Sequence, residues 1–250
     1  MTKRKSYIYE NIIEREEYHD GRYGAPGKKR DKKRKATKEQ VRKINQYNKS
    51  KKARRRLREY FKEDDWLLTL TYRKECRPTD IKGCAKDVSK AIRKLRKIYR
   101  KRGYELYWIR NIENTPRNSW HIHLVVKRLP DTDPQLLLKT IWPHGKVYPN
   151  LLYENGGFKN LADYITKDEN TKKEDVAPEV LDHKITEASY SSSRNMPLTP
   201  PKETTLIRWP KEPRVNEGWA LDKESHFEGI NPVTGYKYRH YTLIRIHRRI

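Results

Sequence analysis

Glu113-Asn-Thr-Pro-Arg-Asn-Ser-Trp-His-Ile-His-Leu-Val-Val-Lys127 is the stretch of sequence from which the fold can be worked out. Its second half alternates and then becomes apolar and rich in β-branched residues, as buried strands do. Side chains alternate faces along a strand, so His121 and His123 point the same way. Residues 104–112 form a second strand-like run, and residues 114–119 between the two runs are rich in turn formers. The stretch therefore predicts a β-hairpin.

With the hairpin centred near Arg117, Glu113 falls opposite His121 on the same face of the sheet. Two imidazoles and one carboxylate then converge and leave coordination positions open. This set, Glu113, His121 and His123, suits a catalytic divalent metal better than a closed structural one. The alternative is that the histidines are ordinary half-buried strand residues, although a carboxylate opposite them has no packing role on an apolar sheet. Asn111 is the reserve ligand if the register slips by two residues.

The composition is strongly basic, with a formal net charge of +25 over 250 residues. A charge excess of this size implies a polyanionic partner, either nucleic acid or an anionic membrane. No apolar run approaches the roughly 20 residues of a membrane span, which favours nucleic acid. The aromatic residues agree, because 17 Tyr and 6 Trp against 3 Phe supply rings with polar edges, suited to base stacking. The two cysteines form no disulfide framework, so we expect a reducing compartment.

The basic residues are concentrated near the N-terminus, where residues 28–58 carry 17 Lys and Arg against 2 acidic residues. Thr37, followed by Glu39 and Gln40, is typical of a helix start. We predict a loose lead-in over residues 1–27 and, over residues 1–62 as a whole, a basic arm or helix that binds DNA phosphates. A solvated basic linker is the alternative. The cations expected to contact DNA are Lys28, Lys29, Arg30, Lys32, Lys33, Arg34, Lys35, Arg54, Arg55, Arg56 and Arg58.

The region from residue 63 to residue 170 alternates strand and helix patterns. Strands are predicted over residues 66–72, 104–112, 120–127 and 147–153, and helices over residues 80–101, 134–141 and 158–167. The order strand–helix–strand–strand–helix–strand describes an α+β, ferredoxin-like antiparallel sheet of the RRM or palm type, with helices on one face. The open face would carry the two histidines. Residues 171–250 form an extension of unknown role, in which residues 236–247 alternate like a strand that pairs with an edge of this sheet.

Tyr164 and Lys167 lie three residues apart on the predicted helix 158–167, so the phenol and the ammonium share a helical face. A tyrosine can act as a nucleophile on a phosphate that is positioned and charge-neutralised, and Lys167 can provide the neutralising charge. The Tyr-x-x-Lys pattern alone is common. It gains specificity here because it follows Glu-x7-His-x-His in a strongly basic chain.

These motifs together resemble the HUH endonucleases, and within them the single-tyrosine rolling-circle replication initiators (Rep proteins) of plasmids and bacteriophages. The resemblance covers about residues 60–170. It rests on Leu68-Thr-Leu-Thr-Tyr72 for the first strand, W-H-I-H-L-V-V for the metal pair and A-D-Y-I-T-K for the nucleophile. The lead-in from Lys38 to Phe61 also resembles the Lys- and Asn-rich helix that precedes this domain in phage-type members.

The resemblance implies a metal-dependent, site-specific DNA endonuclease that nicks and later rejoins single-stranded origin DNA, with Mg²⁺ or Mn²⁺ as cofactor. Tyr164 would attack an origin phosphate, leaving a 5′-phosphotyrosine and a free 3′-OH from which a polymerase extends. It further implies single-stranded and origin DNA, a host helicase and a host polymerase as partners, and a cytoplasmic location in a bacterial host. No second tyrosine lies one helical turn from Tyr164, which departs from the two-tyrosine initiators.

Two other classes remain open. A conjugative relaxase or a single-tyrosine transposase is related, but relaxases usually bring a third histidine and an N-terminal nucleophile, and the transposases lack so long a basic lead-in. A catalytically silent nucleic-acid-binding protein with a ferredoxin-like sheet is the unrelated alternative. Such proteins place aromatic side chains on the sheet face, so the residues found there discriminate between an enzyme and a silent binding protein.

Overall fold

The computed structural model describes residues 1–20, 35–130, 134–153, 157–172, 176, 180–181, 183–231 and 235–246. It divides the chain into two compact units. The terminal unit combines Met1–Asn45 with Thr199–Ile250, and the central unit is Gln46–Leu198. This division differs from the three regions expected from the sequence, 1–62, 63–170 and 171–250, because strands from both ends of the chain share one sheet.

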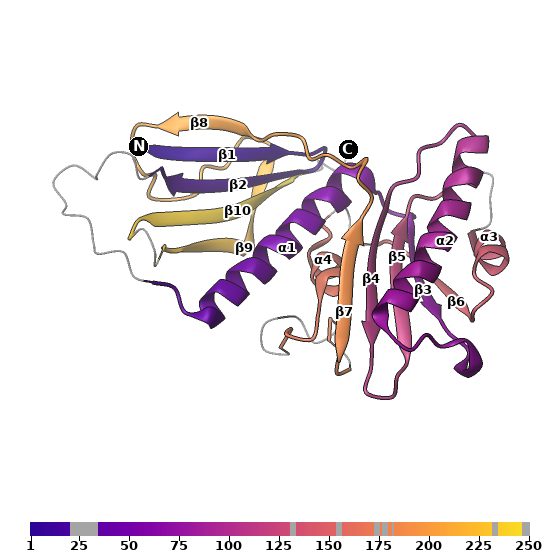
Figure 1. Cartoon of the computed structure of the whole chain (residues 1–250). Helices are drawn as coiled ribbons and strands as arrows, with labels where there is room; N and C mark the ends of the chain where they lie inside the picture. The colour runs from indigo at the N-terminus through magenta and orange to yellow at the C-terminus, as the bar shows by residue number, and fades with distance from the viewer. Residues whose placement is uncertain are drawn as a thin grey trace. The chain divides into compact units, whose positions relative to one another are not determined.

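The described residues form two antiparallel five-stranded sheets and four α-helices (Figure 1). The terminal unit holds β1 (Thr2–Ile8), β2 (Ile12–His19), β8 (Lys202–Leu206), β9 (Trp219–Ile230) and β10 (Lys237–Arg245) in the order β8-β1-β2-β10-β9. The central unit holds β3 (Trp66–Thr71), the 3-10 turn η1 (Lys74–Cys76), α2 (Ile81–Lys101), β4 (Trp108–Asn114), β5 (Trp120–Val126), α3 (Pro134–Ile141), β6 (Val147–Leu151), α4 (Lys159–Thr166) and β7 (Glu187–Ser192). Helix α1 (Lys38–Tyr60) begins in the terminal unit and continues into the central one.

The central sheet confirms the α+β, ferredoxin-like prediction. Its order is β6-β3-β5-β4-β7, in which the first four strands keep the ferredoxin-like arrangement. Strand β7 extends the sheet beyond β4 and comes from the region to which the sequence assigned no role. No helix in the described part of the chain is long and apolar enough to cross a membrane.

The two faces of the central sheet are covered to different extents. On one face, α2 and α3 pack on alternate residues of β3, β4 and β5, including Leu68 and Ile122. The other face carries the histidines, and it is partly covered by α4 and by the end of α1, where Leu57 and Ile165 are fully buried. This partial cover was not predicted, because α1 is polar along most of its length. Its buried apolar residues lie in the last two turns, as Ala53 and Leu57, with Phe61 directly after the helix.

Local signals account for where the two long helices begin and end. The Asp80 side chain accepts a hydrogen bond from the Gly83 N–H (2.7 Å) and caps α2, and Gly103 follows that helix with a φ of +77°. At the start of α1, Thr37 and Gln40 form a reciprocal capping box: Gln40 N–H donates to Thr37 Oγ1 at 3.1 Å, and Thr37 N–H donates to Gln40 Oε1 at 2.9 Å. The predicted helix starts are therefore confirmed.

The expected loose lead-in is instead a strand hairpin over residues 2–8 and 12–19. Its inward positions carry charges that are paired across the sheet. Arg4 contacts Glu17 at 2.7 Å, and Arg239 of β10 contacts the same carboxylate at 3.4 Å. The strand predicted over residues 236–247 is present, but it pairs with β2 and β9 in the terminal sheet and not with the central one. These strands could not be recognised from a hydrophobic pattern, because charged residues occupy their inward positions.

A close backbone contact fixes the turn before β6. A Cβ on Gly145 would lie 2.0 Å from the carbonyl oxygen of Thr71, the last residue of β3. The neighbouring Thr71 N–H donates to Lys146 O at 2.9 Å. Only glycine fits at this crossing of two backbone segments.

Candidate active site

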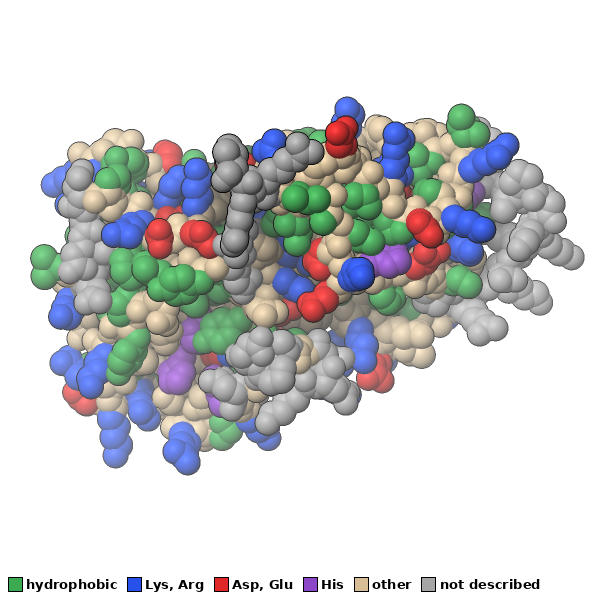
Figure 2. All heavy atoms as spheres, turned by 180° about the vertical axis from the view of Figure 1, so that it is seen from behind, with side chains coloured by type: hydrophobic (Ala, Val, Ile, Leu, Met, Phe, Trp, Pro, Cys, Tyr) green, Lys and Arg blue, Asp and Glu red, His purple; other side chains and the backbone are tan. Residues whose placement is uncertain are grey.

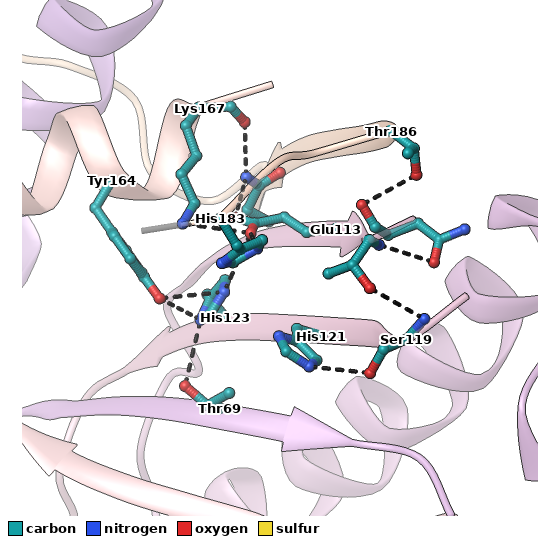
Figure 3. Close-up of polar contacts among 12 residues, drawn as sticks. Thr69, Glu113, Ser119, His121, His123, Tyr164, Lys167, His183 and Thr186 are labelled. Atoms are coloured by element: carbon teal, nitrogen blue, oxygen red, sulfur yellow. Dashed lines mark hydrogen bonds and ion pairs between the residues drawn. The ribbon is translucent and has the colours of Figure 1, made fainter. Parts of the chain in front are cut away.

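The site is built on the hairpin that the sequence predicted. Strands β4 and β5 pair so that Glu113 faces His121 and Asn111 faces His123. Strand β3 lies on the other side of β5 and places Thr69 opposite His123. The expected register is confirmed, and these side chains point to one face of the sheet (Figure 3).

Glu113 is the centre of the charged groups. Its side chain is fully buried, and its Oε2 atom lies 3.4 Å from Lys167 Nζ and 3.5 Å from Nε2 of both His123 and His183 (Figure 3). Burial alone would raise the pKa of this carboxyl group, but the polar contacts with the two histidines and the charge of Lys167 together hold it well below its ordinary value. Glu113 is therefore ionised at neutral pH.

Helix α4 brings Tyr164 over the sheet. Its hydroxyl lies 3.1 Å from Nδ1 and 3.2 Å from Nε2 of His123, at the edge of the imidazole ring. Lys167 follows the last helical residue, and its ammonium lies 4.0 Å from the centre of the Tyr164 ring. The phenol and the ammonium are thus close together, although the ammonium reaches on toward Glu113.

Polar contacts hold α4 against α1. Ser50 donates a short hydrogen bond to Asp163, Gln46 donates to the Thr166 carbonyl at 3.1 Å, and Lys49 pairs with Asp168 at 2.9 Å. On the sheet side, Asn111 donates to Glu113 Oε1 at 3.0 Å and to the Lys167 carbonyl at 2.9 Å. The helix that carries Tyr164 is therefore fixed from both sides.

The side chains of Glu113, His121 and His123 were predicted to hold a metal ion, and their positions can be compared with that prediction. His121 Nε2 lies 3.2 Å from Ser119 Oγ, and among the described residues no three His, Cys, Asp or Glu side chains are already placed to hold a metal ion. The chemistry of the donors nevertheless fits. Glu113 Oε2 is buried and accepts no hydrogen bond of normal geometry from the described residues. Its 3.5 Å separation from His123 Nε2 is close to the roughly 3.4 Å between two ligands that each lie about 2.1 Å from one tetrahedral metal ion.

His121 is half-buried at the edge of this group. Burial lowers the pKa of its imidazole, and the neighbouring His123 and His183 lower it further. A neutral imidazole is the form that binds metal ions. The ring centres of His121 and His183 are 5.9 Å apart.

His183 is the residue that sequence reasoning missed. It lies in the segment before β7, and its Nε2 atom is 3.5 Å from Glu113 Oε2 (Figure 3). A single histidine in a charged, irregular stretch carries no periodic signal. Only the pairing of β7 with β4, in which Ala188 lies opposite Glu113, brings its segment to the site.

The basic residues predicted to contact DNA fall into three groups. Residues 28–34 lie outside the described residues, and Lys35 is exposed. Arg54 and Arg55 are buried, while Arg56 and Arg58 are half-buried and donate to backbone carbonyls of Met196 (3.4 Å) and Gly157 (3.1 Å). Elsewhere, the face in Figure 2 shows Lys and Arg interspersed with acidic and hydrophobic side chains.

The side chains around Glu113 can therefore hold a cation or a phosphate next to the phenol of Tyr164. The fully buried carboxylate is compensated by an ammonium and imidazoles, and the Tyr164 hydroxyl contacts a ring nitrogen of His123. The sheet face around Glu113 carries histidine, asparagine and threonine rather than the row of aromatic side chains typical of RNA readers.

Neither the curated proteins nor the solved structures contain a significant match to this chain. A family model does match: the family described as replication-associated protein ORF2 covers residues 65–169, somewhat less than half of the chain. The matched segment runs from β3 through α4 and contains Glu113, His121, His123, Tyr164 and Lys167, whereas His183 lies outside it. The match supports a DNA-binding replication protein of the rolling-circle initiator kind.

Proposed function

We propose that the protein starts rolling-circle replication by nicking single-stranded origin DNA through Tyr164 and by rejoining strands later. The observation that carries the proposal is the contact between the Tyr164 hydroxyl and His123, on a sheet face that also holds a buried, ionised Glu113. A phenol in contact with an imidazole, beside a lysine, has the groups that phosphoryl transfer to tyrosine requires.

In the proposed reaction the phenolic oxygen of Tyr164 forms a bond to phosphorus and the bond to the 3′ oxygen breaks. The products are a 5′-phosphotyrosine and a free 3′-OH, which takes up a proton. The phenol gives up its proton to solvent as the bond to phosphorus forms, because an imidazole that holds a metal ion through one nitrogen carries a proton on the other and cannot accept a second. His123 contacts the phenolic oxygen and positions it. Lys167 keeps positive charge beside the phenol and would counter the charge of the phosphate.

Glu113, His121 and His123 are proposed to hold a divalent metal ion, Mg²⁺ or Mn²⁺, with His183 as an adjacent fourth donor. When bound, this ion would withdraw charge from the scissile phosphate. The protein's own contribution is to keep the carboxylate ionised and its neighbouring imidazole His121 neutral, as the directions of their pKa shifts require.

The experiment is adduct formation on labelled single-stranded DNA from the protein's own replicon, with Mn²⁺ or with EDTA. The wild type should yield a denaturation-resistant protein–DNA adduct in Mn²⁺ only. Tyr164→Phe should yield none, while Tyr148→Phe, the matched control on β6 at the sheet surface, should behave like the wild type. Adducts from Tyr164→Phe would show that another residue is the nucleophile. The absence of an adduct from the wild type, with DNA binding retained, would favour the silent binding protein.

A further inference from the structure

A cavity of about 530 Å³ opens on the central unit beside the proposed active site. It lies between the middle of α1 and strand β7, and no Asp or Glu among the described residues lines it. The cationic and aromatic side chains of its lining are Lys49, Lys51, Lys52, Arg55, Arg56 and Tyr190. A concave surface lined by five cations has the electrostatics of an anion site rather than of a solvated helix face, although one of them, Lys49, is also paired with Asp168.

Tyr190 connects this cavity to the proposed active site. It lies on β7 directly opposite Asn111 of β4, so both side chains are on the sheet face that carries Glu113. Neighbouring strands are about 4.8 Å apart, so Tyr190, two strands from His123, lies roughly 10 Å from it across the sheet. Lys49 makes the second connection, because it pairs with Asp168, the residue that follows Lys167.

The lining contains hydrogen-bond donors that suit a phosphate. The Tyr190 hydroxyl is buried next to the side chains of Arg56 and Ser192, without a hydrogen bond of normal geometry to the described residues. Burial raises the pKa of this phenol, against the opposing effect of the nearby Arg56, so the hydroxyl keeps its proton at neutral pH. Lys52, two turns before the end of α1, is exposed. A hydroxyl and ammonium groups around one cavity suit phosphate oxygens, and the aromatic ring beside them suits the sugar or base that a phosphate carries.

We infer that this cavity binds one nucleotide, held mainly by its phosphate, of the single DNA strand whose neighbouring phosphate reaches Tyr164. The inference rests on the proposed function. A strand that crosses the site must continue past it, and the cavity is a cationic depression that adjoins the site along the sheet. It would fix the register of the strand, so that one linkage lies at the phenol.

The test measures DNA binding in EDTA, where no nicking is expected, by fluorescence anisotropy of a labelled single-stranded oligonucleotide at several salt concentrations. Lys52→Glu in the full chain should weaken binding by roughly tenfold at low salt. It should also reduce the slope of log K against log salt by about 0.7, because one phosphate is no longer neutralised. Lys97→Glu is the matched control, because Lys97 is also exposed but lies on α2, on the opposite face of the sheet. It should leave the slope unchanged.

Tyr190→Phe keeps the ring and removes the hydroxyl, so it should weaken binding by several-fold without changing the slope. A neutral methylphosphonate placed at successive linkages should weaken wild-type binding most at one position. At that position it should have little further effect on Lys52→Glu, because the variant no longer offers that phosphate a cation.

Equal losses of affinity for Lys52→Glu and Lys97→Glu would overturn the inference, since they would reflect net charge alone. Displacement of the oligonucleotide by equimolar free mononucleotide would also overturn it, by assigning the cavity to a soluble nucleotide. The nicking proposal is judged separately. If no adduct forms but Lys52→Glu weakens DNA binding more than Lys97→Glu does, the cavity is still a DNA-binding site and the proposed nicking activity is wrong.

Discussion

At the scale of single residues, Glu113 and Lys167 depend on each other. Both side chains are fully buried, and their charged atoms are 3.4 Å apart. Removing one partner of a buried ion pair leaves an uncompensated charge, which costs more than the pair itself contributes. Lys167 therefore has a structural role in addition to its proposed role beside the phenol of Tyr164.

Lys167→Ala should destabilise the fold by about 3 kcal/mol and slow nicking by roughly 10²-fold without abolishing it. Adding Glu113→Gln should recover most of the stability, because no buried carboxylate is then left unpaired, but it should recover none of the activity. Urea unfolding of both single variants and of the double variant measures the coupling between them. Additive losses of stability would show that the two charges do not interact.

His183 is expected to support metal binding although it lies outside the matched family segment. His183→Ala should weaken Mn²⁺ binding by about 10- to 100-fold, the range found when groups next to metal ligands are removed. His144→Ala is the control, since that ring packs against Trp142 and Tyr72, away from Glu113. Isothermal titration calorimetry gives the affinities, and identical values for His183→Ala and the wild type would remove His183 from the site.

At the scale of elements, a single close crossing determines how the end of β3 meets the turn before β6. The added Cβ of Gly145→Ala would overlap the Thr71 carbonyl, and backbone cannot move aside as a side chain can. We expect a loss of about 3 kcal/mol or more in unfolding free energy. Gly103→Ala meets no atom within 4 Å and carries only the strain of its positive φ, about 1 kcal/mol. Thermal unfolding should give a clearly lower midpoint for Gly145→Ala than for Gly103→Ala. Similar midpoints would show that the backbone at Gly145 has room for a Cβ atom.

The sequence predicted those elements whose apolar residues repeat with a clear period. Helix α2, strand β3 and the β4–β5 hairpin were all recognisable, and the hairpin register followed from its turn. Strands β1 and β2 were not recognisable, because inward residues such as Arg4 and Glu17 are polar and pair only when distant strands meet. His183 could not be predicted as a site residue for the same reason. Its position depends on the pairing of β7 with β4, which no local sequence pattern encodes.

At the scale of the whole molecule, the basic arm is continuous with folded structure. Removing residues 1–58 would take away two strands of the terminal sheet and the buried Leu57 of α1, so it cannot report on charge alone. Replacing the seven cations at positions 28–30 and 32–35 with glutamine leaves those elements intact. Binding should weaken alike for all single-stranded sequences, and the salt slope should fall by up to about 0.7 for each phosphate that is no longer neutralised. An unchanged slope in anisotropy titrations would show that the arm does not contact DNA.

The pairing of β10 with β2 also determines when the terminal sheet can fold during synthesis of the chain. The hairpin of residues 2–19 is synthesised long before Lys237–Arg245, which it needs as a neighbour. At about 5–20 residues per second this is a wait of tens of seconds, during which a two-stranded hairpin is marginally stable and both its edges are open. The central unit, Gln46–Leu198, is complete well before then. The nascent chain would therefore carry a folded central unit, with the candidate site on it, while the terminal sheet still lacked strand β10.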